Sequence, residues 1–380
     1  MQRPISPTAT TDIRVIGNGK HLAIVAEKPQ ALEENCGLLV RAALSHGFVV
    51  SCLAPGFPAG RANGGVLNGA LLQPIEVRAG DSAPLKSRLA HASIASFCCA
   101  RQPDAIIACS IAALPAMSGN LAGPAGSPKI SCLITPADEI DVHEGPWWRR
   151  WELPYKLAHC ETIFTSDWRL YSAFCQNQSL MKKSKVVLTP GPGCDLEALQ
   201  MQELPSGDLV VALLDNDNPG FLKEFSDTAR QLFSPSRNLK FIVARRACYA
   251  TDVDHEQGGE PWLEYRTYTL NREIDVIAPA HIIVLGPTRM PYPAPLMSAL
   301  ATGRPLIAKD TPAMRDAIDE VVNGVLVATG ETKSLDSAMK LLLRRPDLLA
   351  SMGRASRAKA ERRFDTREIN AAVLAQLGIA

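Results

Sequence analysis

The sequence predicts an α/β protein made of two Rossmann-like domains, each with a doubly wound parallel sheet. Two observations support this fold class. The chain has 380 residues, which is enough for two domains of ordinary size. In both halves, short apolar runs typical of buried strands alternate with segments whose apolar residues recur at helical spacing. This alternation favours parallel sheets covered by helices on both faces.

In the amino half, residues 21–27 form the first predicted strand. A helix follows, because Leu32, Cys36, Leu39, Val40 and Ala43 share one face of a 3.6-residue repeat. The next strand is expected at residues 48–55, after the glycine at position 47. A helix within residues 81–104 and buried strands at 105–110, 129–135, 160–166 and 185–188 continue the alternation. The glycine-rich residues 56–70 predict an ordinary loop.

In the carboxyl half, residues 281–327 predict strand, proline-rich loop, helix, strand, loop, helix and strand. The apolar run 282–285 ends at Gly286-Pro287, as expected of a strand buried on both faces. Pro295 suits the first turn of a helix, and Gly303 suits the left-handed residue that ends one. The next strand is expected at 306–308. Open α/β sheets bind ligands where such strands give way to helices, so we expect a binding site in this segment.

We divide the chain into four parts. Residues 1–19 are expected to be a flexible lead and residues 20–200 an amino-terminal domain. The turn-rich segment around residues 200–207 is expected to be a linker. Residues 207–360 are expected to form the carboxyl-terminal domain, and residues 361–380 a carboxyl-terminal helix.

Three segments resemble those of family 4 glycosyltransferases, which are retaining enzymes of the GT-B fold. In the first, the matching residues are Gly303, Pro305, Ile307, Ala308, Asn323, Gly324, Leu326 and Val327. The second is the tail RRPDLLASMGRASRAKAERRFD, and the third is the inter-domain segment KVVLTPGPGCDLEAL. The resemblance implies a GT-B fold, with an acceptor-side amino domain and a donor-side carboxyl domain that face each other across a cleft. It also implies transfer of a hexose-type sugar from a nucleotide-sugar to a glycan or lipid-linked acceptor, in polysaccharide or glycoconjugate synthesis.

Several positions differ from the pattern of that family. Its two glutamates, which hold the donor sugar and the ribose, correspond to Met290 and Ser298. Its arginine and lysine, which neutralise the leaving diphosphate, correspond to Leu214 and Pro219. The amino-domain histidine of the family aligns near Pro136.

Backbone donors are also fewer at the predicted donor loop. Pro293 and Pro295 each remove an N–H group where a diphosphate would meet a helix start. Losing one preorganised donor typically costs about 2.7–4 kcal/mol of transition-state stabilisation. The sequence therefore leaves two hypotheses. The chain is a diverged glycosyltransferase, or it is a catalytically inactive relative that binds a glycan or holds a partner protein.

The donor-binding candidates are charged or polar residues near the predicted strand ends. Asp316 stands where the family has a glutamate, Ser298 stands at one of the lost glutamates, and Arg245 ends a predicted strand. The full set is Arg245, Arg289, Tyr292, Ser298, Lys309 and Asp316.

The acceptor-binding candidates lie in one loop of the amino half, at Trp147, Trp148, Arg149 and Arg150. Tryptophan stacks on sugars or sits at lipid headgroups, and arginine binds phosphate. The alternative is that the tryptophans pack the loop onto its own domain. No catalytic residue is assigned; His143 and Glu144 are the candidates for an acid–base pair, although neighbouring loop residues rarely point at one target.

Composition narrows the class of protein. The formal net charge is +1, so no bulk attraction to nucleic acid is expected. No apolar run is long enough to span a membrane, and the first residues do not form a secretory signal. We expect a cytoplasmic protein, with peripheral contact at the inner membrane face as an alternative. The ten cysteines lack a C-x-x-C pair, so we expect buried, reduced thiols and no metal site. The expected ligands are a nucleotide-sugar and a glycan, with no cofactor.

Overall fold

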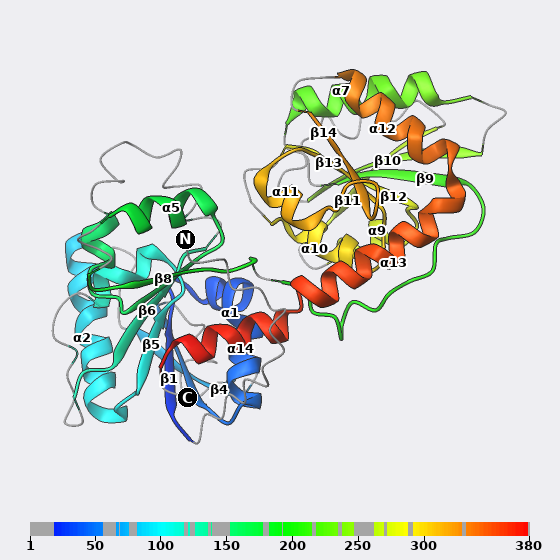
Figure 1. The fold of residues 1–380 in the computed structure, drawn as a ribbon. Helices are drawn as coiled ribbons and strands as arrows, with labels where there is room; N and C mark the ends of the chain where they lie inside the picture. Colours follow the sequence, from blue (N-terminus) through cyan, green and yellow to red (C-terminus); the bar gives the residue numbers. More distant parts are fainter. Residues whose placement is uncertain are drawn as a thin grey trace. The chain divides into compact units, whose positions relative to one another are not determined.

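The computed structural model describes residues 19–55, 66–67, 69–75, 82–117, 121, 126–135, 138, 153–177, 182–191, 193–214, 218–234, 238–246, 262–269, 272–287, 292–328 and 332–378. The chain forms two compact units (Figure 1). Unit 1 comprises residues 1–192 together with residues 366–380, and unit 2 comprises residues 193–365.

Unit 1 is built on an eight-stranded sheet with the order β3-β4-β2-β1-β5-β6-β7-β8. Seven of these strands run parallel, and the short β3 pairs antiparallel with β4. The strands are β1 His21–Val25, β2 Val49–Pro55, β3 Val66–Leu67, β4 Ala70–Ile75, β5 Ala105–Ala108, β6 Lys129–Leu133, β7 Thr162–Thr165 and β8 Lys185–Leu188.

Helices cover both faces of this sheet (Figure 1). On one face lie α1 (Pro29–Ser45) and α14 (Thr366–Gln376); on the other lie α2 (Ala83–Arg101), the 3-10 helix η1 (Ile111–Met117) and α5 (Trp168–Gln176). The apolar stripe predicted for α1 is confirmed. All five of its residues are at most 3% exposed and pack against strands of the sheet.

Unit 2 is built on a six-stranded, fully parallel sheet with the order β11-β10-β9-β12-β13-β14. The strands are β9 Leu209–Leu214, β10 Leu239–Arg246, β11 Leu263–Tyr268, β12 Ile282–Leu285, β13 Leu306–Lys309 and β14 Gly324–Val327. The helices α7 (Pro219–Leu232) and α12 (Thr332–Arg344) cover one face. The helices α9 (Ile274–Ile277), α10 (Ala294–Ala301), α11 (Pro312–Ala317) and part of α13 (Pro346–Arg363) cover the other (Figure 1).

The packing of α10 against α13 depends on two glycines. Gly303 has φ +74° and ends α10, as its residue type predicts. A Cβ atom on Gly353, in α13, would lie 2.4 Å from the carbonyl oxygen of Gly303, so only glycine allows this approach. This contact holds α13 against the helix that follows β12.

The division between the units lies earlier than the linker expected at residues 200–207. Cys194 and Leu196 are buried in the core of unit 2. The fully buried Arg304 donates to the carbonyl oxygen of Gln202 at 2.9 Å and to that of Ile277 at 3.3 Å. Burial lowers the pKa of this guanidinium. Residues 194–203 are therefore bound to unit 2 by both apolar packing and hydrogen bonds.

The carboxyl-terminal segment also differs from the single helix expected at residues 361–380. The helix α13 ends at Arg363, and the chain then makes a bridge between Cys194 and Asp365 before α14 begins. Val373 and Leu374 of α14 pack on the face of the unit 1 sheet that α1 covers. The last helix therefore completes unit 1, although it follows unit 2 in the chain.

Candidate functional site

In unit 2 the chain reverses its direction of travel across the sheet between β9 and β12. Strands β9, β10 and β11 proceed towards one edge, and β12, β13 and β14 proceed towards the other. The loops that follow β9 and β12 therefore diverge at the carboxyl ends of these strands. Doubly wound sheets commonly bind ligands outside such a reversal, so this edge of the unit 2 sheet is the candidate binding site.

The helix α7 begins beside this point. The side chain of Asn218 accepts a hydrogen bond from the backbone N–H of Phe221 at 3.0 Å and caps the helix. Pro219 occupies the first turn, where its missing N–H costs no helical hydrogen bond. Pro219, which corresponds to the lysine of the family pattern, therefore occupies the first turn of a helix here.

Lys309, a predicted donor-binding residue, is 3% exposed at the end of β13. Its amino group lies 3.1 Å from a carboxylate oxygen of Glu224 in α7 and 3.2 Å from the carbonyl oxygen of Ala328. It also lies 5.0 Å from the ring centroid of Phe221. The structure therefore places Lys309 in an internal ion pair that joins β13 to α7.

Tyr292 and Asp316, two further donor-binding candidates, contact each other. The Tyr292 hydroxyl donates to a carboxylate oxygen of Asp316 at 3.0 Å. Arg363 of α13 donates to the same oxygen from two nitrogens, at 3.3 and 3.2 Å. Asp316 is thus held by a phenol and a guanidinium, which joins α11 to α13.

Ser298, in α10, is 3% exposed and donates a hydrogen bond to a carboxylate oxygen of Glu273 at 3.0 Å. Glu273 immediately precedes α9, in the segment that follows β11. The two residues are 25 positions apart in the sequence. A carboxylate therefore lies beside Ser298, although position 298 itself has lost the glutamate of the family pattern.

Of the remaining donor-binding candidates, Arg245 lies near the carboxyl end of β10, paired in register with Thr267 of β11. Its side chain is half-buried at the edge of the sheet where the reversal lies. Arg289 lies outside the described residues. Among the described candidates, Lys309 and Asp316 are thus each held in an ion pair within unit 2.

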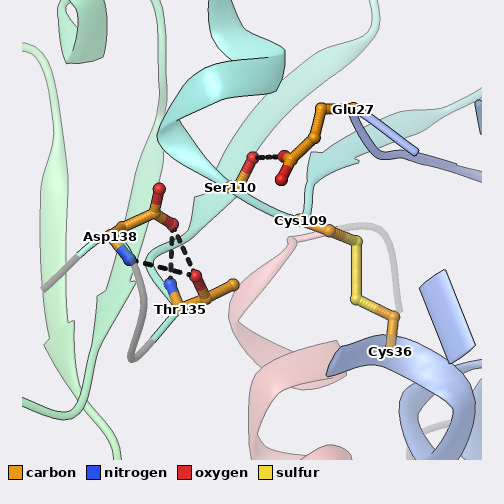
Figure 2. The surroundings of a disulfide bond; sticks show 6 residues. All are labelled: Glu27, Cys36, Cys109, Ser110, Thr135 and Asp138. Atoms are coloured by element: carbon orange, nitrogen blue, oxygen red, sulfur yellow. Dashed lines mark hydrogen bonds between the residues drawn. A yellow bond between two sulfur atoms is a disulfide. The ribbon is translucent and has the colours of Figure 1, made fainter. Parts of the chain in front are cut away.

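Unit 1 has a corresponding reversal between β1 and β5. Glu27 follows β1, and its carboxylate accepts a short hydrogen bond from the hydroxyl of Ser110, which follows β5. Figure 2 shows Glu27 on one side of Ser110 and Asp138 on the other. Two carboxylates therefore flank the start of η1 at the carboxyl edge of this sheet.

Asp138 is held by the backbone and side chain of Thr135, which both donate to one carboxylate oxygen at 2.9 Å. The backbone N–H of Ile111 donates to the other oxygen at 3.2 Å. Burial raises the pKa of Asp138 from 3.8 to about 6. These hydrogen bonds oppose the rise, and the charge of Glu27 adds to it. A carboxyl group with such a pKa can hold or release a proton near neutral pH.

The acceptor-side candidates lie outside the described residues. These are His143 and Glu144, together with Trp147, Trp148, Arg149 and Arg150. They remain predictions from the sequence.

The expectation of reduced thiols is wrong for two cysteines. Cys36 of α1 and Cys109, the residue before Ser110, form a disulfide (Figure 2). Both residues are buried, and their helical and strand-end positions gave no spacing that would reveal the pair. The other described cysteines are free, and burial raises the pKa of Cys52 and Cys160 to about 12, which disfavours reactive thiolates.

No protein-family model matches the chain, and no curated protein matches it in sequence. Solved structures do match. A sucrose-phosphate synthase from Thermosynechococcus elongatus has a TM-score of 0.71 at 12% identity, with 94% of this chain and 98% of that chain covered. HepE from Anabaena, solved with UDP and also with UDP-glucose, has a TM-score of 0.69 at 16% identity in its UDP complex, with 94% and 99% covered.

A third match is a UDP-GlcNAc 2-epimerase from Neisseria meningitidis, solved with UDP-GlcNAc, with a TM-score of 0.59 at 11% identity and coverage of 94% and 99%. The neighbours thus include glycosyltransferases and an epimerase. The chain has the two-unit α/β fold of GT-B proteins, which confirms the fold that the resemblance implied. Identities this low show the fold and leave the reaction to be argued from the site.

Sequence reasoning missed several residues of the candidate site. Glu224 lies in α7 and Glu273 directly precedes α9, at positions that no motif marked. Arg363 lies in the family-like tail segment, but nothing in the sequence marked it as a site residue. Glu27 and Asp138 were also missed. Asp138 stands two positions after Pro136, near which the family's histidine aligns, so an ionisable residue there was a usable signal.

Within the part of the chain that the structure describes, we find no helix that is both long and apolar enough to cross a bilayer.

Proposed function

We propose that this protein is a glycosyltransferase that takes its sugar from a nucleotide-sugar bound by unit 2. The observation that carries the proposal is the reversal between β9 and β12, a ligand-binding position in doubly wound sheets, in a chain with the GT-B fold. The structural neighbour HepE, which was solved with UDP and with UDP-glucose, supports the same class of ligand.

Within this proposal, the diphosphate needs donors other than Lys309 and Arg363. Lys309 and Arg363 are engaged by Glu224 and Asp316, so neither is free to neutralise a diphosphate. We assign the phosphates to the backbone N–H of Gly220 at the start of α7 and to the side chains of Arg245 and Arg289. The donor would bind without a metal ion.

We assign the acceptor to unit 1. Glu27, Ser110 and Asp138 together offer hydroxyl and carboxylate groups at the carboxyl edge of its sheet. Such groups hydrogen-bond the hydroxyls of a sugar. We therefore propose a glycan or lipid-linked acceptor, in polysaccharide or glycoconjugate synthesis, with Trp147, Trp148, Arg149 and Arg150 as further contacts. A cytoplasmic site with peripheral contact at the inner membrane face suits a lipid-linked acceptor.

A second candidate function is favoured by one observation. Two of the predicted donor-binding residues, Lys309 and Asp316, are held in ion pairs of the protein itself. A chain that has neutralised these groups internally could serve as a non-catalytic glycan-binding or scaffold protein. The two candidates differ in whether nucleotide binds and whether sugar is transferred.

Calorimetric titration of the full chain with UDP, GDP and ADP, each with and without EDTA, tests the proposal. We expect micromolar binding of one nucleotide that EDTA leaves unchanged. Arg245→Ala should weaken it, whereas Arg230→Ala, on the exposed surface of α7, should not. Absence of binding by all three nucleotides to the folded protein would contradict the proposal and favour the non-catalytic candidate.

The binding nucleotide then selects the sugar donors for a turnover assay. The protein is incubated with the corresponding nucleotide-sugars and a mixture of glycan acceptors, and products are separated by mass. A product heavier than the acceptor by one sugar supports a transferase. An epimerised nucleotide-sugar that forms without acceptor would replace the transferase with an epimerase, the activity named for one structural neighbour.

A further inference from the structure

Polar residues follow four neighbouring strands of the unit 1 sheet, at the edge where β1, β5, β6 and β7 end. The strand registers, extended by two or three residues, bring Glu27, Ser110 and Thr135 to nearly the same level. Ser166, after β7, lies opposite Thr135 in the same extension. Figure 2 shows Glu27, Ser110 and Thr135 at this edge, where Ser110 donates to Glu27. The sheet therefore carries a row of hydroxyl and carboxylate groups along its carboxyl edge.

A tryptophan stands at the end of this row. Trp168 follows Ser166 by two positions and is the first residue of α5. It is 52% exposed, whereas Trp262, the other described tryptophan, is 5% exposed. A single exposed apolar residue is common on protein surfaces, and two further features distinguish Trp168, namely how its ring is held and which charges lie beside it.

The Trp168 ring is held by the first turn of α5. The carboxylate of Asp167 caps this helix by accepting from the backbone N–H groups of Arg169 at 2.6 Å and Leu170 at 3.3 Å. The ring of Trp168 stacks on that of Tyr171, with the centroids 5.3 Å apart and the planes at 27°. Tyr171 is buried in the core of unit 1. Trp168 is therefore an exposed ring on a fixed support, which loses little conformational freedom when a ligand stacks on it.

The charges at the start of α5 favour an uncharged ligand. The side chain of Arg169 is 68% exposed, but its guanidinium lies 3.1 Å from a carboxylate oxygen of Asp167. This ion pair leaves little positive charge there to attract a phosphate or an anionic lipid surface. A sugar ring has an apolar face of C–H groups that suits the negative face of an indole ring, and its hydroxyls suit the polar row beside it.

We propose that the acceptor is an oligosaccharide, and that Trp168 stacks on one of its sugar rings beyond the ring that is elongated. The inference rests on the proposed function, because it names the class of acceptor that unit 1 binds. Three strand spacings of about 4.8 Å separate β1 from β7, so the row from Glu27 to Trp168 is about 14 Å long. That length exceeds a single sugar ring. The ring that is elongated binds near Glu27 and Ser110, and the following rings extend towards α5.

The turnover assay described above first identifies a sugar that the protein elongates. That sugar is then supplied to the full chain as a monosaccharide and as linear oligosaccharides of increasing length, and kcat and KM are measured for each. The wild-type protein should have a kcat/KM about tenfold higher for a tetrasaccharide than for the monosaccharide, through a lower KM. Trp168→Ala should remove most of this preference by raising KM for the longer acceptors only.

Two further variants separate sugar binding from folding. Trp168→Phe keeps an aromatic ring beside Tyr171 and should keep most of the preference for longer acceptors. Val49→Ala changes an exposed apolar residue at the start of β2, on the opposite edge of the same sheet, and should leave the kinetics of every acceptor unchanged. A merely structural role for Trp168 would lower stability, or kcat for all acceptors alike, without changing the ratio of kcat/KM between long and short acceptors.

The possible failures are distinguishable. If the wild-type protein binds no nucleotide and elongates no acceptor, the proposed function fails and this inference fails with it. If the wild type elongates the monosaccharide and the oligosaccharides equally well, or if Trp168→Ala keeps the full preference, the proposed function stands and the sugar-binding role of Trp168 is overturned. Loss of the preference in Trp168→Ala together with its retention in Trp168→Phe supports the inference.

Discussion

Replacing Asp138 with asparagine should change how the stability of unit 1 depends on pH. The folded state raises the pKa of this carboxyl group from 3.8 to about 6, so it holds a proton more tightly than the unfolded state does. The contribution of Asp138 to stability is therefore fully present below pH 3.8 and is lost as the pH rises through about 6. This shift corresponds to about 3 kcal/mol of unfolding free energy.

Asparagine does not titrate, so the Asp138→Asn variant lacks this loss. Its unfolding free energy relative to the wild type should rise by about 2–2.5 kcal/mol between pH 4 and pH 7.5, whatever constant cost the substitution adds. Urea titrations followed by hydrogen exchange in β5 and β6 would measure the difference within unit 1. Parallel stability curves for the two proteins across this range would refute the reasoning.

The matched control is Asp104→Asn, in the same unit. Burial alone would raise the pKa of Asp104. The hydrogen bonds from the His21 backbone and the Lys20 side chain outweigh it, so the pKa is lowered. Its stabilising contribution is present at neutral pH and is lost in acid. The two variants should therefore diverge from the wild type in opposite directions as the pH changes.

Three further substitutions test the packing of the units. Lys309→Met leaves Glu224 largely buried without its cation and should cost about 3–5 kcal/mol in urea unfolding, and adding Glu224→Gln should recover part of this. Gly353→Ala places a Cβ atom 2.4 Å from a backbone oxygen and should lower stability by at least about 1–3 kcal/mol in the same assay. Changing both Cys36 and Cys109 to alanine removes the disulfide and should lower the free energy of unfolding by about 4 kcal/mol. The comparison is urea unfolding of the variant and of the wild type without reductant. An unchanged midpoint of the urea transition would count against the disulfide.

Much of the fold could be predicted because local signals were sufficient. The buried runs 282–285 and 306–308 appear as β12 and β13, and Gly303 ends α10 with the left-handed backbone that its residue type favours. Patterns of this kind depend on neighbours a few positions apart. The predominantly parallel sheets follow from them, since most strands and helices alternate along the chain.

The candidate site could be predicted only in part, because its contacts join residues that are distant in the sequence. Lys309 was identified, but its partner Glu224 is 85 positions away. Ser298 was identified, but Glu273 precedes it by 25 positions on another element. A motif places a residue at a strand end, and the tertiary structure then decides whether its charge faces a ligand or another side chain.

The charges at the two sheet edges are arranged differently, which bears on the assignment of donor and acceptor. Near the unit 2 edge, the carboxylates of Glu224 and Asp316 are neutralised by Lys309 and Arg363, so they repel an incoming diphosphate less. At the unit 1 edge, the described contacts of Asp138 are with neutral donors, and its pKa of about 6 leaves it largely charged at neutral pH. A diphosphate would be repelled there, whereas an uncharged sugar could donate its hydroxyls. This asymmetry favours the donor on unit 2 and the acceptor on unit 1.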